Sequence, residues 1–301
     1  MKRILSIDGG GIRGIVPTIL LMEIERRTGK RIHEIFDLIV GTSTGGIIAL
    51  MLTKPNPVPL SSILQLYIGQ KGKKIFQKRL FKVPWSDVKF KSENIESVLQ
   101  EVFEGYDISQ CIKPTVITTY DTTTASATFF ASYNERFKNF KMWECARATS
   151  AAPTYFEPFE FNNMVCLDGG LFANNPALFG LVEAQKYYGK NEKFDIVSLG
   201  TGSIMTPLSK RDLDKFNILT WATKLFKFTS DGQSDTSDYV LDKTYNTENN
   251  YFRLQCDLPD NLSDLDNVHD DNLEALVKLA EDNVEGAWKH KLGVLIPRLV
   301  R

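Results

Sequence analysis

Cysteine and histidine are scarce in this 301-residue sequence, which contains four cysteines and three histidines. The cysteines are far apart and form no CxxC pair, a pattern typical of reduced core thiols in a reducing compartment. It argues against a disulfide framework and against a zinc site. The cysteines are Cys111, Cys145, Cys166 and Cys256.

The sequence also lacks long hydrophobic runs and a strong charge of either sign. No segment offers the roughly 18 uninterrupted apolar residues of a membrane-spanning helix. The basic and then apolar N-terminus stops at Asp8, too early for the core of a signal peptide, so we expect a cytoplasmic protein. A net charge of −1 gives no reason to expect nucleic acid as a partner.

Internal repeats, low-complexity tracts and clear linkers are missing as well. A hydrophobic content of 43% and a charged content of 24% are those of a soluble globular protein. We therefore expect one domain over residues 1–301. Its motifs lie within residues 1–202, and residues 203–301 are expected to form a mainly helical covering.

Residues 40–46 have the pattern of a strand, a sharp turn and the start of a helix. The turn fits the G-x-S-x-G nucleophile elbow, which strains the backbone of its serine and exposes the hydroxyl beyond the sheet edge. A Cβ at either glycine would clash where the strand folds back onto the helix. Taken alone, the pentapeptide fits a purely structural turn equally well. Its residues are Gly41, Thr42, Ser43, Thr44 and Gly45.

A similar unit stands at the N-terminus, where a strand at 4–7 leads through a glycine loop into a helix that begins near Pro17 and ends at Gly29. Two such units in succession predict an α/β fold with a mostly parallel sheet and helices on both faces. Further strands are expected at 114–120, 127–133, 164–167, 194–199 and 251–256. Helices are expected at 60–67, 93–103, 142–148 and 177–188, through much of 210–250, and last around 273–280.

Two uses fit the glycine loop of residues 8–14. Gly9, Gly11 and Gly14 formally satisfy the G-x-G-x-x-G of dinucleotide-binding folds, but the acidic ribose ligand is missing after the second strand, and no Walker sequence occurs. The loop could instead form an oxyanion hole, in which glycine amides converge near the positive end of a helix. Arg13 could add a positive charge there or form a surface ion pair. Beside an elbow serine, the loop favours the oxyanion role.

A serine nucleophile also needs a base. His269 and His290 follow Ser43 in the chain order of α/β-hydrolase triads, but they lie in a loop and on a solvated helix face, and His33 precedes the serine. Asp168 is the better candidate, because it stands at a strand end before a Gly-Gly turn. Burial can raise a carboxyl pKa towards neutrality and so make it a base. An ordinary Asx turn is the structural alternative.

Residues 71–91 are basic with interleaved aromatic and aliphatic side chains. Clustered bases attract anionic headgroups and aromatic residues favour the interface, so the segment could dock on a membrane. A solvated basic loop whose apolar residues face the core is the alternative.

Four blocks of the sequence together resemble the patatin-like phospholipase family, and most closely its plant patatin and calcium-independent phospholipase A2 branch. They have the order and spacing of that family's oxyanion loop, nucleophile elbow and aspartate motif. The resemblance covers roughly the first 200 residues. The blocks are residues 8–14, 41–45, 146–156 and 168–176.

The resemblance implies a three-layer patatin-like fold and a dyad with Ser43 as nucleophile and Asp168 as base. It implies hydrolysis of the acyl esters of membrane phospholipids or galactolipids through an acyl-enzyme, with no cofactor, metal or calcium. The implied oxyanion hole comprises Gly9, Gly10, Gly11, Arg13 and Gly14, and the aspartate motif includes Gly169 and Gly170.

Two alternatives stand beside this hydrolase. One is a phospholipase effector of bacterial defence that damages the cell's own membrane once a nucleotide signal or partner binds. The other is a storage protein with residual esterase activity, although intact Ser43 and Asp168 argue against it.

Overall fold

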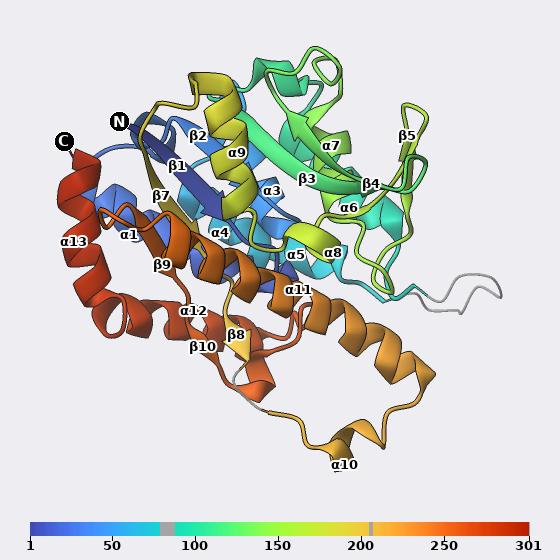
Figure 1. The fold of residues 1–301 in the computed structure, drawn as a ribbon. Helices are drawn as coiled ribbons and strands as arrows, with labels where there is room; N and C mark the ends of the chain where they lie inside the picture. Colours follow the sequence, from blue (N-terminus) through green and yellow to red (C-terminus); the bar gives the residue numbers. More distant parts are fainter. Residues whose placement is uncertain (79–87, 205–206, 301) are drawn as a thin grey trace.

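The structure is a computed structural model that describes residues 1–78, 88–204 and 207–300. Within these residues, eight strands form one central sheet between two layers of helices (Figure 1). Its order is β5-β6-β3-β2-β1-β7-β9, and β4 pairs with β3. The strands are β1 (Lys2–Ile7), β2 (Leu38–Gly41), β3 (Thr115–Asp121), β4 (Ser126–Ala131), β5 (Phe159–Phe161), β6 (Met164–Asp168), β7 (Phe194–Leu199) and β9 (Tyr251–Leu254).

The sheet is mostly parallel, as the sequence predicts. Strands β3, β2, β1, β7 and β9 run parallel to their neighbours in that order, whereas β4 and β6 are antiparallel to β3 and β5 is antiparallel to β6. Two short strands, β8 (Ser203–Ile204) and β10 (Asp257–Leu258), pair separately in parallel. The expected hairpin at 114–133 is present as β3 and β4.

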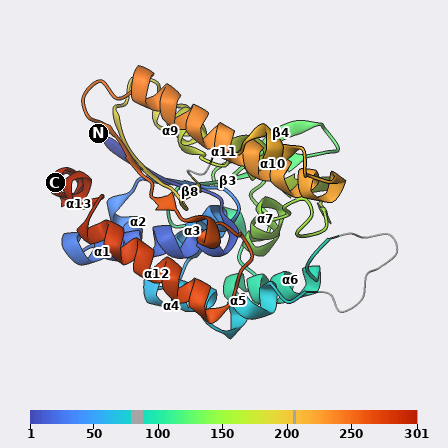
Figure 2. The ribbon, with the colours of Figure 1, turned by 90° about the horizontal axis from the view of Figure 1, so that it is seen from below.

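Helices cover both faces of the sheet, which confirms the predicted fold class. Seen from below, α9 and α11 lie on one side of the strands, and α1, α3, α4 and α12 lie on the other (Figure 2). The first layer contains α8 (Gly170–Ala173), α9 (Ala177–Tyr188) and α11 (Ile218–Thr244). The second contains α1 (Ile15–Thr28), α2 (Ile32–Ile35), α3 (Thr44–Thr53), α4 (Leu60–Ile68), α5 (Gln70–Ile75), α6 (Ser92–Phe103), α7 (Met142–Thr149), α12 (Asp270–Glu285) and α13 (Lys289–Val300).

Alternation along the buried strands divides the core between these layers. In β1, Ile4 packs with the residues of α9, while Leu5 and Ile7 pack in the larger cluster with α1, α3 and α12. Adjacent side chains of a strand point to opposite faces, so each central strand contributes to both cores.

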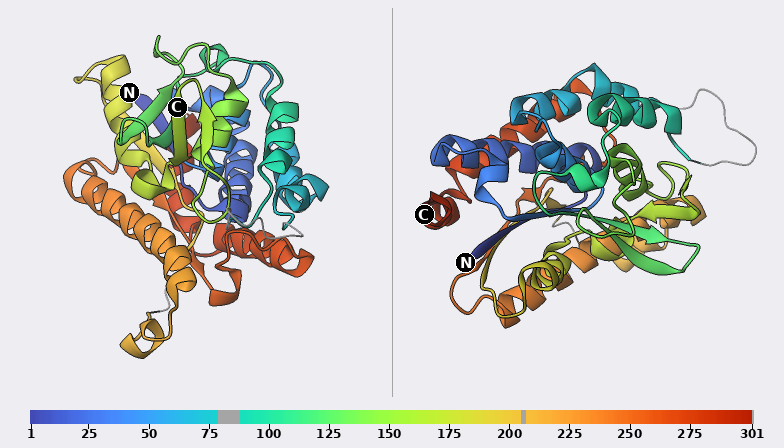
Figure 3. Two further views of the ribbon diagram at one scale, coloured as in Figure 1. Left: turned by 90° about the vertical axis from the view of Figure 1, so that its right-hand side faces the viewer. Right: turned by 90° about the horizontal axis from the view of Figure 1, so that it is seen from above.

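The C-terminal third contains the expected strand near 251–256 as well as helices. Its late strand, β9, completes the far side of the main sheet beside β7. The helix around 273–280 is α12 and is not the last helix, because α13 follows it and buries Leu292, Leu295 and Leu299. Helix α10 (Lys210–Leu213) and the first turns of α11 project away from the body (Figures 1 and 3). No helix of the described ranges is long and apolar enough to cross a membrane.

Two strand ends meet on one edge of β3. Strand β4 occupies the other edge, so β2 and the antiparallel β6 share this one. Strand β2 reaches Ile117 with Gly41, and β6 arrives from the opposite direction and reaches Thr119 with Asp168. On β3, only Thr118 lies between the last residue paired with β2 and the first residue paired with β6. The elbow that follows β2 therefore faces the end of β6.

Candidate active site

The elbow has the strained geometry that its sequence predicts. Ser43 lies between β2 and α3 with φ 53° and ψ −124°, a conformation costly for a residue with a side chain. A Cβ on Gly41 would lie 2.3 Å from the carbonyl oxygen of Gly45, and one on Gly45 would lie 2.2 Å from that of Ile7. Both positions therefore require glycine.

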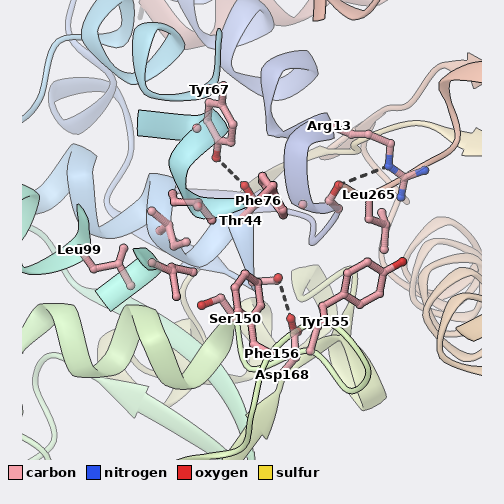
Figure 4. A pocket seen from close by; sticks show the side chains of 18 of the residues that line it. Arg13, Thr44, Tyr67, Phe76, Leu99, Ser150, Tyr155, Phe156, Asp168 and Leu265 are labelled. Carbon is pink, nitrogen blue, oxygen red and sulfur yellow. Dashed lines mark hydrogen bonds between the residues drawn. The ribbon is translucent and has the colours of Figure 1, made fainter. Parts of the chain in front are cut away.

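Ser43 and Asp168 are in direct contact. The Ser43 hydroxyl donates a hydrogen bond of 2.7 Å to Oδ2 of Asp168 (dashed line at Asp168 in Figure 4). The other carboxylate oxygen accepts the amide of Gly170 at 2.7 Å. The aspartate is 1% exposed, and this burial raises its pKa to about 7 although both hydrogen bonds oppose the shift. A carboxylate with this pKa can accept a proton at neutral pH.

Buried threonines form hydrogen bonds around the ends of β2 and β6. The hydroxyls of Thr42 and Thr118 are 2.7 Å apart, and that of Thr42 donates to the carbonyl oxygen of Ala173 at 2.5 Å. A Cβ on Gly169 would lie 2.1 Å from Oγ1 of Thr118, so glycine is needed for the turn to pack there. The Ser43 amide donates to the buried hydroxyl of Thr149 at 2.8 Å.

Sequence reasoning identified no role for Thr118 or Thr149. Thr118 belongs to an ordinary alternating strand pattern. Thr149 lies inside the block 146–156, which contains several hydroxyl side chains. The residue types do not indicate which of these hydroxyls contacts the elbow. Both roles depend on contacts between distant segments.

The glycine loop contributes two free amides. The Gly9 amide donates to the Asn174 carbonyl at 3.0 Å, so it is already engaged. Across the described chain, the amides of Gly10 and Gly11 have no hydrogen-bond partner. These two residues line the same cavity as Ser43, whereas Gly9 and Gly14 do not. Of the residues predicted for an oxyanion hole, Gly10 and Gly11 thus combine an unpaired amide with a position on the cavity wall.

A third free amide belongs to Thr44, the first residue of α3. The first amides of a helix have no acceptor within it, and we find none for Thr44 elsewhere in the described residues. Its hydroxyl contacts that of Tyr67, and a Cβ on Gly14 would lie 2.6 Å from both hydroxyl oxygens. Gly14 therefore lets the loop pack closely against the elbow helix.

Arg13 is buried beside this loop. It is 4% exposed, its Nε donates to the Gly10 carbonyl at 3.4 Å, and its Nη1 has no partner among the described residues. Burial lowers the pKa of Arg13, while the charge of Asp231 on α11 opposes that shift. Lys227 of α11 lines the same cavity, and burial followed by repulsion from Arg13 lowers its pKa.

Asp8, the first residue of the loop, has a supporting position outside the cavity. It is buried and forms two hydrogen bonds of 2.9 and 2.6 Å with the guanidinium of Arg253 on β9. Burial raises the pKa of Asp8, and Arg253 opposes that rise. This pair ties the start of the glycine loop to the last strand of the sheet.

None of the histidines approaches Ser43. All three are among the described residues, and none lines the cavity. His269 is the exposed residue before α12, His290 is exposed on α13, and His33 lies on α2.

The cavity around Ser43 is partly open to solvent and has a volume of about 110 Å³. Its polar side carries Arg13 with Lys227, Ser230 and Asp231 of α11. Figure 4 shows Leu99 and Arg13 on opposite sides of Asp168. Its apolar side is formed by residues of α3 to α6, among them Met51, Leu66, Ile75, Val98, Leu99 and Val102.

Comparison with known proteins identifies one family model and relatives that match most of the chain. The Patatin-like phospholipase model matches residues 5–181. Patatin-like protein 2 of Oryza sativa subsp. indica is 30% identical, over 93% of this chain and 83% of its own length. Patatin-T5 of Solanum tuberosum is also 30% identical, over 94% of this chain and 83% of its own length. VipD from Legionella pneumophila has a TM-score of 0.48 and 12% identity, over 93% of this chain and 67% of that structure. The chain belongs to the patatin-like phospholipase family.

Proposed function

We propose that this chain is a lipid acyl hydrolase that cleaves carboxylic esters of membrane lipids with Ser43 as nucleophile and Asp168 as base. The hydrogen bond of 2.7 Å between the Ser43 hydroxyl and a buried carboxylate with a pKa of about 7 carries the proposal. A serine hydroxyl is a weak nucleophile unless such a base takes its proton.

The reaction begins when Asp168 removes the Ser43 proton while Oγ attacks the ester carbonyl carbon. The carbonyl oxygen becomes an oxyanion, which the free amides of Gly10 and Gly11 stabilise, together with that of Thr44. Each such donor contributes roughly 3–4 kcal/mol in acyl transfer. The C–O bond to the leaving alcohol then breaks, and the alcohol takes the proton from Asp168.

An acyl-enzyme on Ser43 remains. Asp168 next removes a proton from a water molecule, whose oxygen attacks the acyl carbon. The second tetrahedral intermediate collapses, the fatty acid leaves, and Ser43 Oγ recovers its proton. Asp168 acts as base and then as acid in each half, for which a pKa near neutrality is suited.

The two sides of the cavity suit the two ends of a lipid. The apolar side between α3 and α6 would receive the acyl chain, because burying each methylene stabilises the complex by about 0.8 kcal/mol. The charged side, with Arg13, Lys227 and Asp231, would face the headgroup.

The test compares three full-length variants on a soluble short-chain ester. Ser43→Ala and Asp168→Asn should each lower kcat at least about 10³-fold, and His269→Ala should leave it unchanged. Circular dichroism checks that each variant is folded. Activity retained by Asp168→Asn and lost by His269→Ala would replace the dyad with a triad.

Assays of the unaltered chain address the alternatives. A storage protein would hydrolyse the ester hardly better than Ser43→Ala. A gated effector would be inactive alone and active after addition of cyclic dinucleotides or another signal.

A further inference from the structure

An exposed apolar stripe runs along the first half of α11. Its members are spaced by three, four and three residues and therefore share one helix face. The stripe consists of Ile218, Trp221, Leu225 and Phe228. Ile218 is 90% exposed and Leu225 is 59% exposed, and Leu208 near α10 is exposed as well. Contiguous exposed apolar residues of this kind mark interaction surfaces.

The buried face of the same helix packs on the candidate active site. Phe226 is buried and lines the cavity, and the buried Ser230 donates to the carbonyl of Gly170, next to the candidate base, at 3.1 Å. Further along, Ser234 contacts Asp8 at 3.4 Å. The stripe is therefore the outer face of a helix whose inner face forms part of the site.

A surface hollow beside the stripe adjoins the cavity around Ser43. This hollow is lined by Trp221 and Phe228 of the stripe, and by Lys227 and Asp231. Lys227 and Asp231 also line the cavity that contains Ser43. Among the described residues, Lys227 and Asp231 are thus shared by the hollow beside the stripe and the cavity around Ser43.

Basic side chains outnumber acidic ones around the stripe, and this charge indicates the kind of surface that the stripe contacts. Residues 207–231, which include the stripe and the hollow's Asp231, contain five basic side chains and three acidic ones. One of the acids, Asp212, accepts hydrogen bonds from Ser209 and forms an ion pair with Lys215. Basic side chains around an apolar helix face are typical of segments that lie on anionic lipid surfaces, where each base adds about 1 kcal/mol.

The sequence predicts membrane docking for residues 71–91. In the described part of this segment, several basic side chains already form ion pairs. Lys71, Lys73 and Lys89 pair with Glu101, Asp270 and Asp266. Ile75 and Phe76 are half-buried and line the cavity. Residues 79–87 lie outside the described residues, so a role for them stays a prediction.

We propose that the α11 stripe docks on an anionic lipid surface, so that a lipid enters past Lys227 and Asp231 to reach Ser43. This inference rests on the proposed function, because it identifies where the hydrolase meets its substrate. It assigns the exposed apolar residues to the membrane and the inner face of α11 to the reaction.

The test uses two substitutions outside the cavity, Ile218→Ser and Leu225→Ser, in one chain. The matched control is Tyr239→Ser, which alters an exposed residue of the same helix about 20 Å further along. Each is added to Ser43→Ala to prevent hydrolysis, and binding to vesicles of phosphatidylglycerol and phosphatidylcholine is measured by sedimentation.

The double variant should bind at least about tenfold more weakly than its parent, and Tyr239→Ser should bind as well as the parent. With Ser43 restored, the double variant should lose hydrolysis of these vesicles in proportion but keep its rate on a soluble short-chain ester. Binding should also weaken when phosphatidylglycerol is left out or when salt is raised.

Unchanged vesicle binding by the double variant would overturn the proposal, as would an equal loss in Tyr239→Ser or a parallel loss on the soluble ester. A dimer that the double variant turns into a monomer without loss of vesicle binding would show that the stripe joins two copies of the chain. If the unaltered chain hydrolyses no ester but the double variant loses vesicle binding, the docking surface stands and the proposed function fails.

Discussion

At the scale of single residues, the burial of Asp168 favours catalysis but lowers the stability of the fold. A carboxylate buried to 1% exposure is costly, and among the described residues the Gly170 amide and the Ser43 hydroxyl are the groups that donate hydrogen bonds to it. Burial outweighs both hydrogen bonds and raises the pKa to about 7. The same burial that makes Asp168 a base should therefore make it a weak point of the fold.

The rate should follow the ionisation of Asp168. Because the base must be charged, kcat/KM for a soluble short-chain ester should rise as pH increases through about 7 and then level off. A pH profile between about 5 and 9 measures this. The midpoint should stay in place in His269→Ala and His290→Ala. A midpoint that moves with either histidine, or a rate that falls as pH rises, would contradict the role of Asp168.

Asp168→Asn should stabilise the protein at alkaline pH while it abolishes activity. The pKa is about 7 in the folded chain and close to 4 in the unfolded chain, so the unfolded chain binds fewer protons between these values. The free energy of unfolding of the unaltered chain therefore falls as pH rises from about 4 to 7, by at most on the order of 4 kcal/mol. Asparagine cannot ionise and escapes this loss.

Urea unfolding at about pH 5 and pH 8 provides the measurement. The advantage of Asp168→Asn over the unaltered chain should be larger at the higher pH. The exposed Asp282→Asn serves as the control and should show no such gain. An advantage that is equal at both pH values would mean that Asp168 ionises in the folded chain as it does in the unfolded chain.

At the scale of elements, the wall between α4 and α6 sets the depth of the cavity. Leu66 of α4 and Val102 of α6 line the cavity around Ser43 and also a surface hollow on its outer side. Both side chains are half-buried, as expected for a wall with space on each side. The acyl chain of a substrate would end against this wall.

Leu66→Ala should open the cavity into the outer hollow and so extend the acyl chains that fit. The ratio of kcat/KM for a palmitoyl ester to that for an octanoyl ester should rise several-fold, with little change for the shorter ester. Leu64→Ala is the matched control, because Leu64 lines the outer hollow but not the cavity around Ser43. An equal shift in both variants, or a loss for both esters, would show that Leu66 does not limit chain length.

At the scale of the whole molecule, the last third of the chain completes the sheet on which the site is built. Strand β9 pairs with β7, which pairs with β1, and Arg253 of β9 binds Asp8 at the end of β1. We propose that residues 1–301 form a single domain for this reason. A chain that ends at residue 202 would lack β9 and leave the buried Asp8 without its partner.

Arg253→Met should destabilise the whole protein by about 3–5 kcal/mol, because it leaves the buried charge of Asp8 unpaired. Chemical unfolding should remain one transition for the variant and for the unaltered chain. Arg26→Met removes an exposed ion pair with Glu23 and should destabilise the protein far less than Arg253→Met does. Two separate transitions, or equal costs for Arg253→Met and Arg26→Met, would refute the single-domain proposal.

Much of the fold was predictable because its elements have local causes. The strand at 194–199 agrees with β7 at both ends, and α4 and α6 differ from their expected bounds by one residue. What was missed depends on distant partners. Helix α13, for example, is defined by leucines that bury against the larger core. The helix expected through much of 210–250 is present, but its continuity over residues 218–244 depends on an inner face that packs against the site.

The sequence alone determined the elbow, the glycine loop, the strand-end aspartate and the scarcity of histidine, because each follows from backbone sterics or from residue type. Only the tertiary structure decided that β2 and β6 end against each other on β3, which brings the Ser43 hydroxyl within 2.7 Å of Asp168. It also decided which loop amides are free and raised the pKa of Asp168. Strand register, amide pairing and desolvation are set by segments that lie far apart in the sequence, and no local pattern contains them.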